Sequence, residues 1–146
     1  MSKTAQPKIY FACSIRGGRE QANIYPAIVQ AIEDAGAVAL SEIFADGKLS
    51  AAGIKTPSKD IWNKDMSWLS EADAVIAEVS VPSLGVGYEI REAEHQQKPV
   101  LALYKSVNGS KLSAMIDGAP GVAVFNYENL EDAVSEINDF IKALKK

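Results

Sequence analysis

The stretch Tyr10-Phe11-Ala12-Cys13-Ser14-Ile15-Arg16-Gly17-Gly18-Arg19-Glu20 passes from an apolar run through a glycine turn into a helical pattern. Glycines let a backbone approach an anion closely, and the N-terminus of a helix offers free N–H groups. The two arginines add charge with a fork-shaped set of donors. The stretch therefore predicts a strand, a turn and a helix, with a site for a small phosphorylated ligand at the turn.

Apolar runs and helical patterns alternate along the rest of the chain. The apolar runs predict short strands, and they cover residues 8–13, 38–41, 74–79, 100–104 and 121–127. Helical spacing of apolar residues predicts helices over 19–35, from 58 or 60 onward, from about 88 to 97, and over 130–144. Such alternation is typical of right-handed βαβ units and a parallel sheet covered on both faces.

The whole chain, residues 1–146, is accordingly predicted to form a single α/β domain. The expected fold is flavodoxin-like (Rossmann-like), with a doubly wound, five-stranded parallel sheet in the order 2-1-3-4-5. Residues 1–7 are expected to form a flexible tail and residues 42–58 a mobile loop. In such sheets ligands bind at the carboxyl ends of the strands, near the switch point between strands 1 and 3.

Composition narrows the classes of partner. The net charge of −4 argues against a nucleic acid polymer, whose phosphates attract basic proteins. No apolar run approaches the roughly 20 residues of a membrane span, and residues 1–7 lack the apolar core of a signal peptide. The single cysteine, Cys13, suits a reducing compartment. We therefore expect no membrane association and a cytoplasmic location, with the nucleus as the alternative.

Two carboxylates stand out as candidates for chemistry. Glu89 follows the glycine-containing segment 82–87 and is expected just inside a helix, where the dipole would keep it ionised and facing the cleft. Asp65 lies in a helix between Trp62 and Trp68, although Asp is a poor residue for a helix interior. Glu89 could instead only complement the helix dipole, and Asp65 could lie on a solvated face. Together they supply the two carboxyl groups that glycosidic bond cleavage needs.

Other residues give weaker signals. His95 is the only histidine and is expected on the surface, whereas Cys13 and the pair Trp62 and Trp68 are expected in the core. Without further His or Cys residues, neither a zinc site nor a Ser-His-Asp triad can be assembled. No metal and no cofactor is expected.

Five segments recur in the order of a known family: residues 11–20, 65–69, 72–79, 82–89 and 112–116. Together they resemble the 2′-deoxynucleoside 5′-phosphate N-hydrolases, within the wider nucleoside 2-deoxyribosyltransferase family. The resemblance covers nearly the whole chain. It implies that Glu89 is a nucleophile that attacks C1′ to form a covalent glycosyl intermediate, that Asp65 orients the sugar or moves a proton, and that Tyr10 lies close to Glu89.

The resemblance also implies a substrate-binding set and a partner. The monophosphate and sugar would be bound by Ser14, Ile15, Arg16, Gly17, Gly18, Arg19, Ser83, Gly85, Ser113 and Met115. Ser113 matches a serine that reaches the phosphate site of the neighbouring subunit. A homodimer is therefore implied.

The function that the resemblance implies is hydrolysis of the N-glycosidic bond of nucleoside or 2′-deoxynucleoside 5′-monophosphates, giving a free base and ribose or 2-deoxyribose 5-phosphate. One alternative is a transferase that moves deoxyribose between bases, although such enzymes take unphosphorylated nucleosides. Another is a nucleotide-binding regulator that has lost catalysis. A flavodoxin-like signalling domain is a third, but an acidic cluster would then follow the first strand, where this chain has Ser and Arg.

Overall fold

A computed structural model of the protein describes residues 5–15, 24–43, 56–106 and 108–145. The predictions for Arg16, Gly17, Gly18 and Arg19 lie outside these residues, as do those for the first turns of the first helix. Most of the predicted loop, residues 44–55, lies outside them as well.

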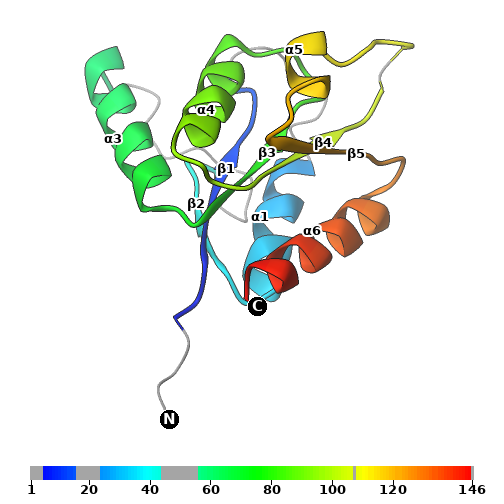
Figure 1. Ribbon diagram of the computed structural model, residues 1–146, viewed down its shortest axis with the longest axis horizontal. Helices are drawn as coiled ribbons and strands as arrows, with labels where there is room; N and C mark the ends of the chain where they lie inside the picture. The colour runs from blue at the N-terminus through cyan, green and yellow to red at the C-terminus, as the bar shows by residue number, and fades with distance from the viewer. Residues whose placement is uncertain (1–4, 16–23, 44–55, 107, 146) are drawn as a thin grey trace.

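Five parallel strands form one sheet in the order β2-β1-β3-β4-β5, which confirms the predicted topology (Figure 1). In chain order the strands are β1 (Lys8–Ala12), β2 (Val38–Leu40), β3 (Ala74–Glu78), β4 (Val100–Tyr104) and β5 (Val122–Asn126). Tyr10 of β1 pairs with Leu40 on one side and Val75 on the other. The first strand therefore lies at the point where the strand order reverses.

Helices cover both faces of the sheet (Figure 1). They are α1 (Ile24–Asp34), α3 (Ser58–Glu71), α4 (Leu84–His95), α5 (Ala114–Asp117) and α6 (Leu130–Leu144). One core cluster joins the sheet to α1 and α6, and a second joins it to α3, α4 and α5. Because side chains alternate along a strand, Ile9 and Phe11 enter the first cluster whereas Tyr10 enters the second, on the side of α3 and α4.

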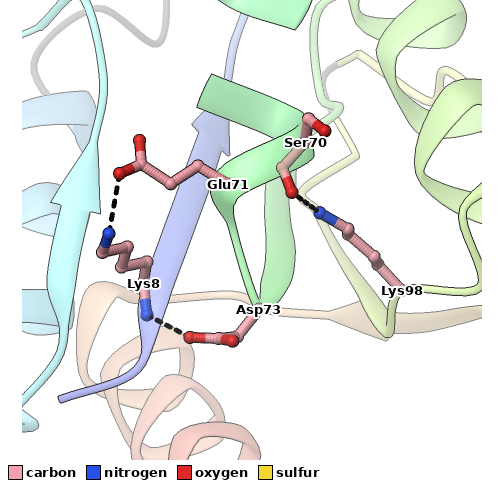
Figure 2. A network of polar contacts seen from close by, with 5 residues as sticks. All are labelled: Lys8, Ser70, Glu71, Asp73 and Lys98. Carbon is pink, nitrogen blue, oxygen red and sulfur yellow. Dashed lines mark hydrogen bonds and ion pairs between the residues drawn. The ribbon is translucent and has the colours of Figure 1, made fainter. Parts of the chain in front are cut away.

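The C-terminal end of α3 is held at the amino edge of the sheet by charged groups (Figure 2). The backbone N–H of Lys8 donates to Asp73 at 2.8 Å, and the Lys8 ammonium pairs with Glu71 at 2.7 Å. Lys98 donates from Nζ to the carbonyl of Ser70 at 2.5 Å, where a positive charge complements the helix dipole. These contacts fix the helix that carries Asp65.

The helix that was predicted to begin at about Tyr88 begins earlier, so the predicted start is wrong. The helix α4 begins at Leu84, and the side chain of Ser83 caps it by accepting a hydrogen bond from the N–H of Val86 at 3.3 Å. Gly85 and Gly87 suggested a turn because glycine is a poor helix former. The serine cap satisfies one of the free N–H groups of the first helical turn and allows the helix to begin earlier.

The last residue of the predicted tail and the ends of the predicted loop take part in the fold. Pro7 is buried, and its carbonyl accepts a hydrogen bond from the N–H of Val38 at 2.8 Å. Ile43 is buried in the cluster beneath α1. The short helix α5 was not predicted, because four residues are too few to show a helical period.

Replacement of Leu101 tests the packing of β4, an interior strand of the sheet. Leu101 is fully buried in β4, so Leu101→Ala should lower the free energy of unfolding by about 2–5 kcal/mol, measured by chemical denaturation. Val38→Ala on the edge strand is the control, because Val38 is 38% exposed and should cost less than about 1 kcal/mol. Equal losses at the two positions would contradict the core described here.

Candidate active site

The first strand and the fourth helix meet through two side chains. Tyr10 is only 4% exposed, and its hydroxyl donates a hydrogen bond to Oε2 of Glu89. Burial, together with the nearby negative charge of Glu89, raises the pKa of Tyr10 well above its usual value. The tyrosine therefore remains protonated, and it orients the glutamate as a hydrogen-bond donor.

The second predicted carboxylate, Asp65, lies on α3, half-buried on the same side of the sheet. Its Oδ1 atom is buried and has no hydrogen-bond partner among the described residues. The neighbouring Lys64 pairs with Glu42 at 2.6 Å and also lies over the ring of Trp68, 4.9 Å from its centroid. A polar atom buried without a partner is costly, so Asp65 is suited to receive a ligand group.

The pKa of Glu89 is raised to about 7. Burial is the main cause, and the charges of Asp65 and Glu42 add to it, whereas the hydrogen bond from Tyr10 opposes the shift. A carboxyl group with this pKa is only partly ionised at neutral pH, so burial outweighs the expected effect of the helix dipole. Glu89 is the sixth residue of α4, beyond the first turn, where the dipole effect has faded.

The pKa of Asp65 is raised to about 6. Burial again contributes most, the charge of Glu42 adds to it, and Lys64 opposes it. Glu42 was not identified from the sequence, although its place directly after the second strand could have marked it. Two carboxyl groups that titrate near neutral pH can divide the roles of nucleophile and proton donor.

The structure brings together the described parts of the predicted phosphate site. Ser14 and Ile15 follow β1, and Ser83 and Gly85 begin α4 after the neighbouring strand β3. Ser14 is buried, whereas Ile15 is 43% exposed. Both segments begin at the carboxyl ends of adjacent parallel strands, which is where the predicted fold places a ligand site.

Ser113 and Met115 lie on the surface at the start of α5. The Ser113 side chain accepts a hydrogen bond from the N–H of Met115 at 3.2 Å, and Met115 is 81% exposed. Their neighbours Leu112 and Ile116 pack against the core cluster that also contains residues of α3 and α4. Their exposed position is that of residues available to a second molecule.

The weaker predictions have mixed outcomes. His95 is exposed and Cys13 is buried, as expected, and burial raises the pKa of the Cys13 thiol. The prediction that Trp62 belongs to the core is wrong, since it is 52% exposed and donates from Nε1 to the hydroxyl of Tyr88 at 3.2 Å. Trp68 packs partly buried against the core. The alternation of polar and apolar residues along α3 could not separate these two positions.

The described parts of the chain contain no group of three or more His, Cys, Asp and Glu side chains arranged to hold a metal ion. Among the helices described, none is both long and apolar enough to cross a lipid bilayer.

The fold and the site define a class of α/β protein whose carboxyl groups gather at the switch point of a parallel sheet. Comparison with known sequences gives the family. The profile of the nucleoside 2-deoxyribosyltransferase family matches residues 9–133. The chain belongs to this family.

Individual relatives extend over nearly the whole chain. A 5-hydroxymethyl-dUMP N-hydrolase of Esox lucius is 39% identical and is aligned over 94% of this chain and 98% of its own. The Homo sapiens protein of the same name is 41% identical over 90% of this chain and 76% of its own. The structure of a CMP N-glycosidase from Clostridium botulinum shares the fold, with a TM-score of 0.62, 19% identity, and coverage of 90% of this chain and 98% of that one.

The raised pKa of Glu89 has a consequence for stability. Its pKa of about 7 in the folded state exceeds the ordinary value of 4.5, so the folded protein binds the proton more tightly and loses stability as pH rises from about 4.5 to 7. Glu89→Gln removes this loss. The variant should be more stable than the wild type by roughly 1–3 kcal/mol at pH 8 and nearly equal at pH 4.

Urea denaturation at both pH values measures this difference. Glu92→Gln is the control, because it makes the same change one helical turn along α4. A Glu89→Gln variant that is less stable than the wild type at pH 8 would contradict the burial of an ionisable Glu89.

Proposed function

We propose that this protein hydrolyses the N-glycosidic bond of 2′-deoxynucleoside 5′-monophosphates, releasing a free base and 2-deoxyribose 5-phosphate. The observation that carries the proposal is the Tyr10–Glu89 hydrogen bond beside Asp65, at the switch point of the sheet. Its support is the similarity to proteins named 5-hydroxymethyl-dUMP N-hydrolase, over nearly the full chain.

In the proposed first step, Oε1 of ionised Glu89 attacks C1′ of the sugar while the bond from C1′ to the base nitrogen breaks. The tyrosine holds Oε2, which leaves Oε1 as the attacking atom. The bonding electrons leave with the base, and Asp65, which carries the one proton of the carboxyl pair in this form, gives that proton to the base. A glycosyl ester on Glu89 results, and the carboxylate stabilises the oxocarbenium-like transition state.

In the second step, water attacks C1′ from the opposite side and releases Glu89 as a carboxylate. Asp65, now ionised, accepts the proton of that water and returns to its starting state. A pKa near 6 suits this exchange, because the group can both give and take a proton at neutral pH. No further reactant is needed.

Monophosphate recognition would fall to the segment from Ser14 to Arg19, with Ser83 and Gly85 from the start of α4. The first turn of a helix and paired arginines are a favourable environment for a phosphate dianion. This chemistry favours the hydrolase over a deoxyribosyltransferase acting on plain nucleosides. The raised pKa values of Asp65 and Glu89 favour catalysis over a purely regulatory role.

We further propose that the active form is a homodimer in which Ser113 completes the phosphate site of the partner subunit. Large side chains are exposed close to Ser113 and on α4: Met115 is 81% exposed, Leu84 96% and Tyr88 56%. Apolar side chains with this exposure are stabilised when a second copy covers them. The family resemblance supports the role of Ser113.

Base release from a panel of nucleotides tests the proposed activity. Deoxynucleoside 5′-monophosphates, including 5-hydroxymethyl-dUMP, should release free base, whereas the matching nucleosides should react at least 100-fold more slowly because they lack the phosphate. Glu89→Gln should abolish release and still bind the nucleotide, measured by calorimetry.

The other outcomes of this panel are equally decisive. Release only from nucleosides in the presence of an acceptor base would identify a transferase. Binding without release from any substrate would identify a regulator.

Mixing two inactive variants tests the shared site. Ser113→Asp should inactivate the enzyme by repelling the phosphate, and Glu89→Gln should inactivate it by removing the nucleophile. In the mixed dimer, one site combines Glu89 of one subunit with Ser113 of the other. The mixture should therefore recover about a quarter of wild-type activity after subunit exchange. A mixture that stays inactive after confirmed exchange would contradict the shared site.

A further inference from the structure

The protein has a second buried glutamate, Glu78, which takes no part in the proposed reaction. Glu78 is the last residue of β3, and none of its surface is exposed. Its Oε1 accepts the backbone N–H of Ser80 at 2.7 Å. Its Oε2 accepts the Ser80 hydroxyl at 2.9 Å and the hydroxyl of Tyr127. Burying a carboxylate costs free energy, and these three hydrogen bonds compensate for that cost. Such a group is expected to have a structural or functional role.

All three partners of Glu78 are donors, so the network fits the ionised carboxylate. The Ser80 hydroxyl oxygen also accepts the backbone N–H of Lys105 at 2.8 Å, which directs its own proton towards Glu78. Burial raises the pKa of Glu78, whereas the hydrogen bonds from Tyr127 and Ser80 and the charge of Lys105 oppose that shift. A glutamine at this position would place an amide N–H against groups that need an acceptor.

The network ties the carboxyl ends of three strands together. Glu78 ends β3, Lys105 directly follows β4, and Tyr127 directly follows β5, where its N–H also donates to the carbonyl of Tyr104 at 3.0 Å. The connection it fixes is short: five residues separate Glu78 from Leu84, the first residue of α4. The direction in which α4 leaves the sheet therefore depends on Ser80.

Glu78 cannot itself contact the reacting atoms. Side chains alternate along β3, so Glu78 faces the same side as Ile76, which belongs to the cluster under α1 and α6. Burial raises the pKa values of Tyr25 in α1 and of Cys13, which directly follows β1, and both groups are close enough for the charge of Glu78 to add to the shift. The Tyr10–Glu89 pair lies on the opposite face.

We propose that Glu78 is a positioning residue, which in its ionised form holds the turn between β3 and α4 so that Ser83 and Glu89 meet the substrate correctly. The inference rests on the proposed N-hydrolase activity for its kinetic consequence. Its structural consequence, a turn fixed by one buried carboxylate, does not depend on that activity.

The test compares Glu78→Gln with a control at the other end of the same strand. In the variant, kcat should fall about 10–100-fold while the KM for the nucleotide changes less than about threefold, because small misplacement of a reacting group affects chemistry more than binding. Asp73→Asn makes the same carboxyl-to-amide change at the acceptor of the hydrogen bond from the Lys8 N–H at the amino edge, and it should leave kcat within about twofold.

Amide hydrogen exchange provides a readout that needs no activity. In Glu78→Gln, exchange at residues 80–84 should accelerate at least about tenfold, whereas Asp73→Asn should leave these amides unchanged. If the wild type releases no base, the proposed function fails and exchange alone decides the role of Glu78.

Tyr127→Phe carries the test if Glu78→Gln does not fold, because it removes a single donor and keeps the ring. Its kcat should fall about 3–10-fold. Where Glu78→Gln does fold, the double variant should lose little more kcat than Glu78→Gln alone. A folded Glu78→Gln with unchanged exchange at residues 80–84, or a kcat within about twofold of the wild type, would overturn the proposal. So would an equal loss of kcat in Asp73→Asn.

Discussion

The hydrogen bond from Tyr10 to Glu89 is the contact on which the site depends. The bond can form because β1 lies between β2 and β3 and points the side chain of Tyr10 towards the helices α3 and α4. Since α4 follows β3 in the chain, Glu89 lies next to β1. The bond has a cost, since it holds a carboxyl group in a buried place. The raised pKa of Glu89 reflects that cost, and the sheet and its two packed faces must offset it.

Much of the fold could be predicted from the sequence because the pattern is repeated and strong. Apolar runs such as residues 74–79 and 100–104 are typical of buried parallel strands, and the strand order follows from their alternation with helices. Local exceptions were harder to predict. Gly85 and Gly87 suggested a turn where α4 in fact begins. The helix α5 has only four residues, which are too few to show a helical period.

The site could be predicted only in part, because a sequence shows which groups exist but not how deeply they are buried. Asp65 and Glu89 were identified from their positions and from the family resemblance, whereas their raised pKa values depend on packing. Glu42 comes close to Asp65 and Glu89 only when the chain is folded, where it pairs with Lys64. Burial raises the pKa values of both carboxyl groups, and the charge of Glu42 adds to the shift. Glu78 looked like an ordinary strand residue. Two of its three donors belong to the nearby Ser80, but the third is the hydroxyl of Tyr127, which is distant in the sequence.

The proposed mechanism requires that Glu89 forms a bond to C1′ and that water then breaks it. The stereochemistry at C1′ when the enzyme cleaves the nucleotide in a methanol–water mixture tests this mechanism. Two successive displacements at C1′ predict that a β-nucleotide gives the β-methyl glycoside of 2-deoxyribose 5-phosphate, with retained configuration. The α-methyl glycoside would show a single displacement by solvent, and it would contradict the role of Glu89 as nucleophile.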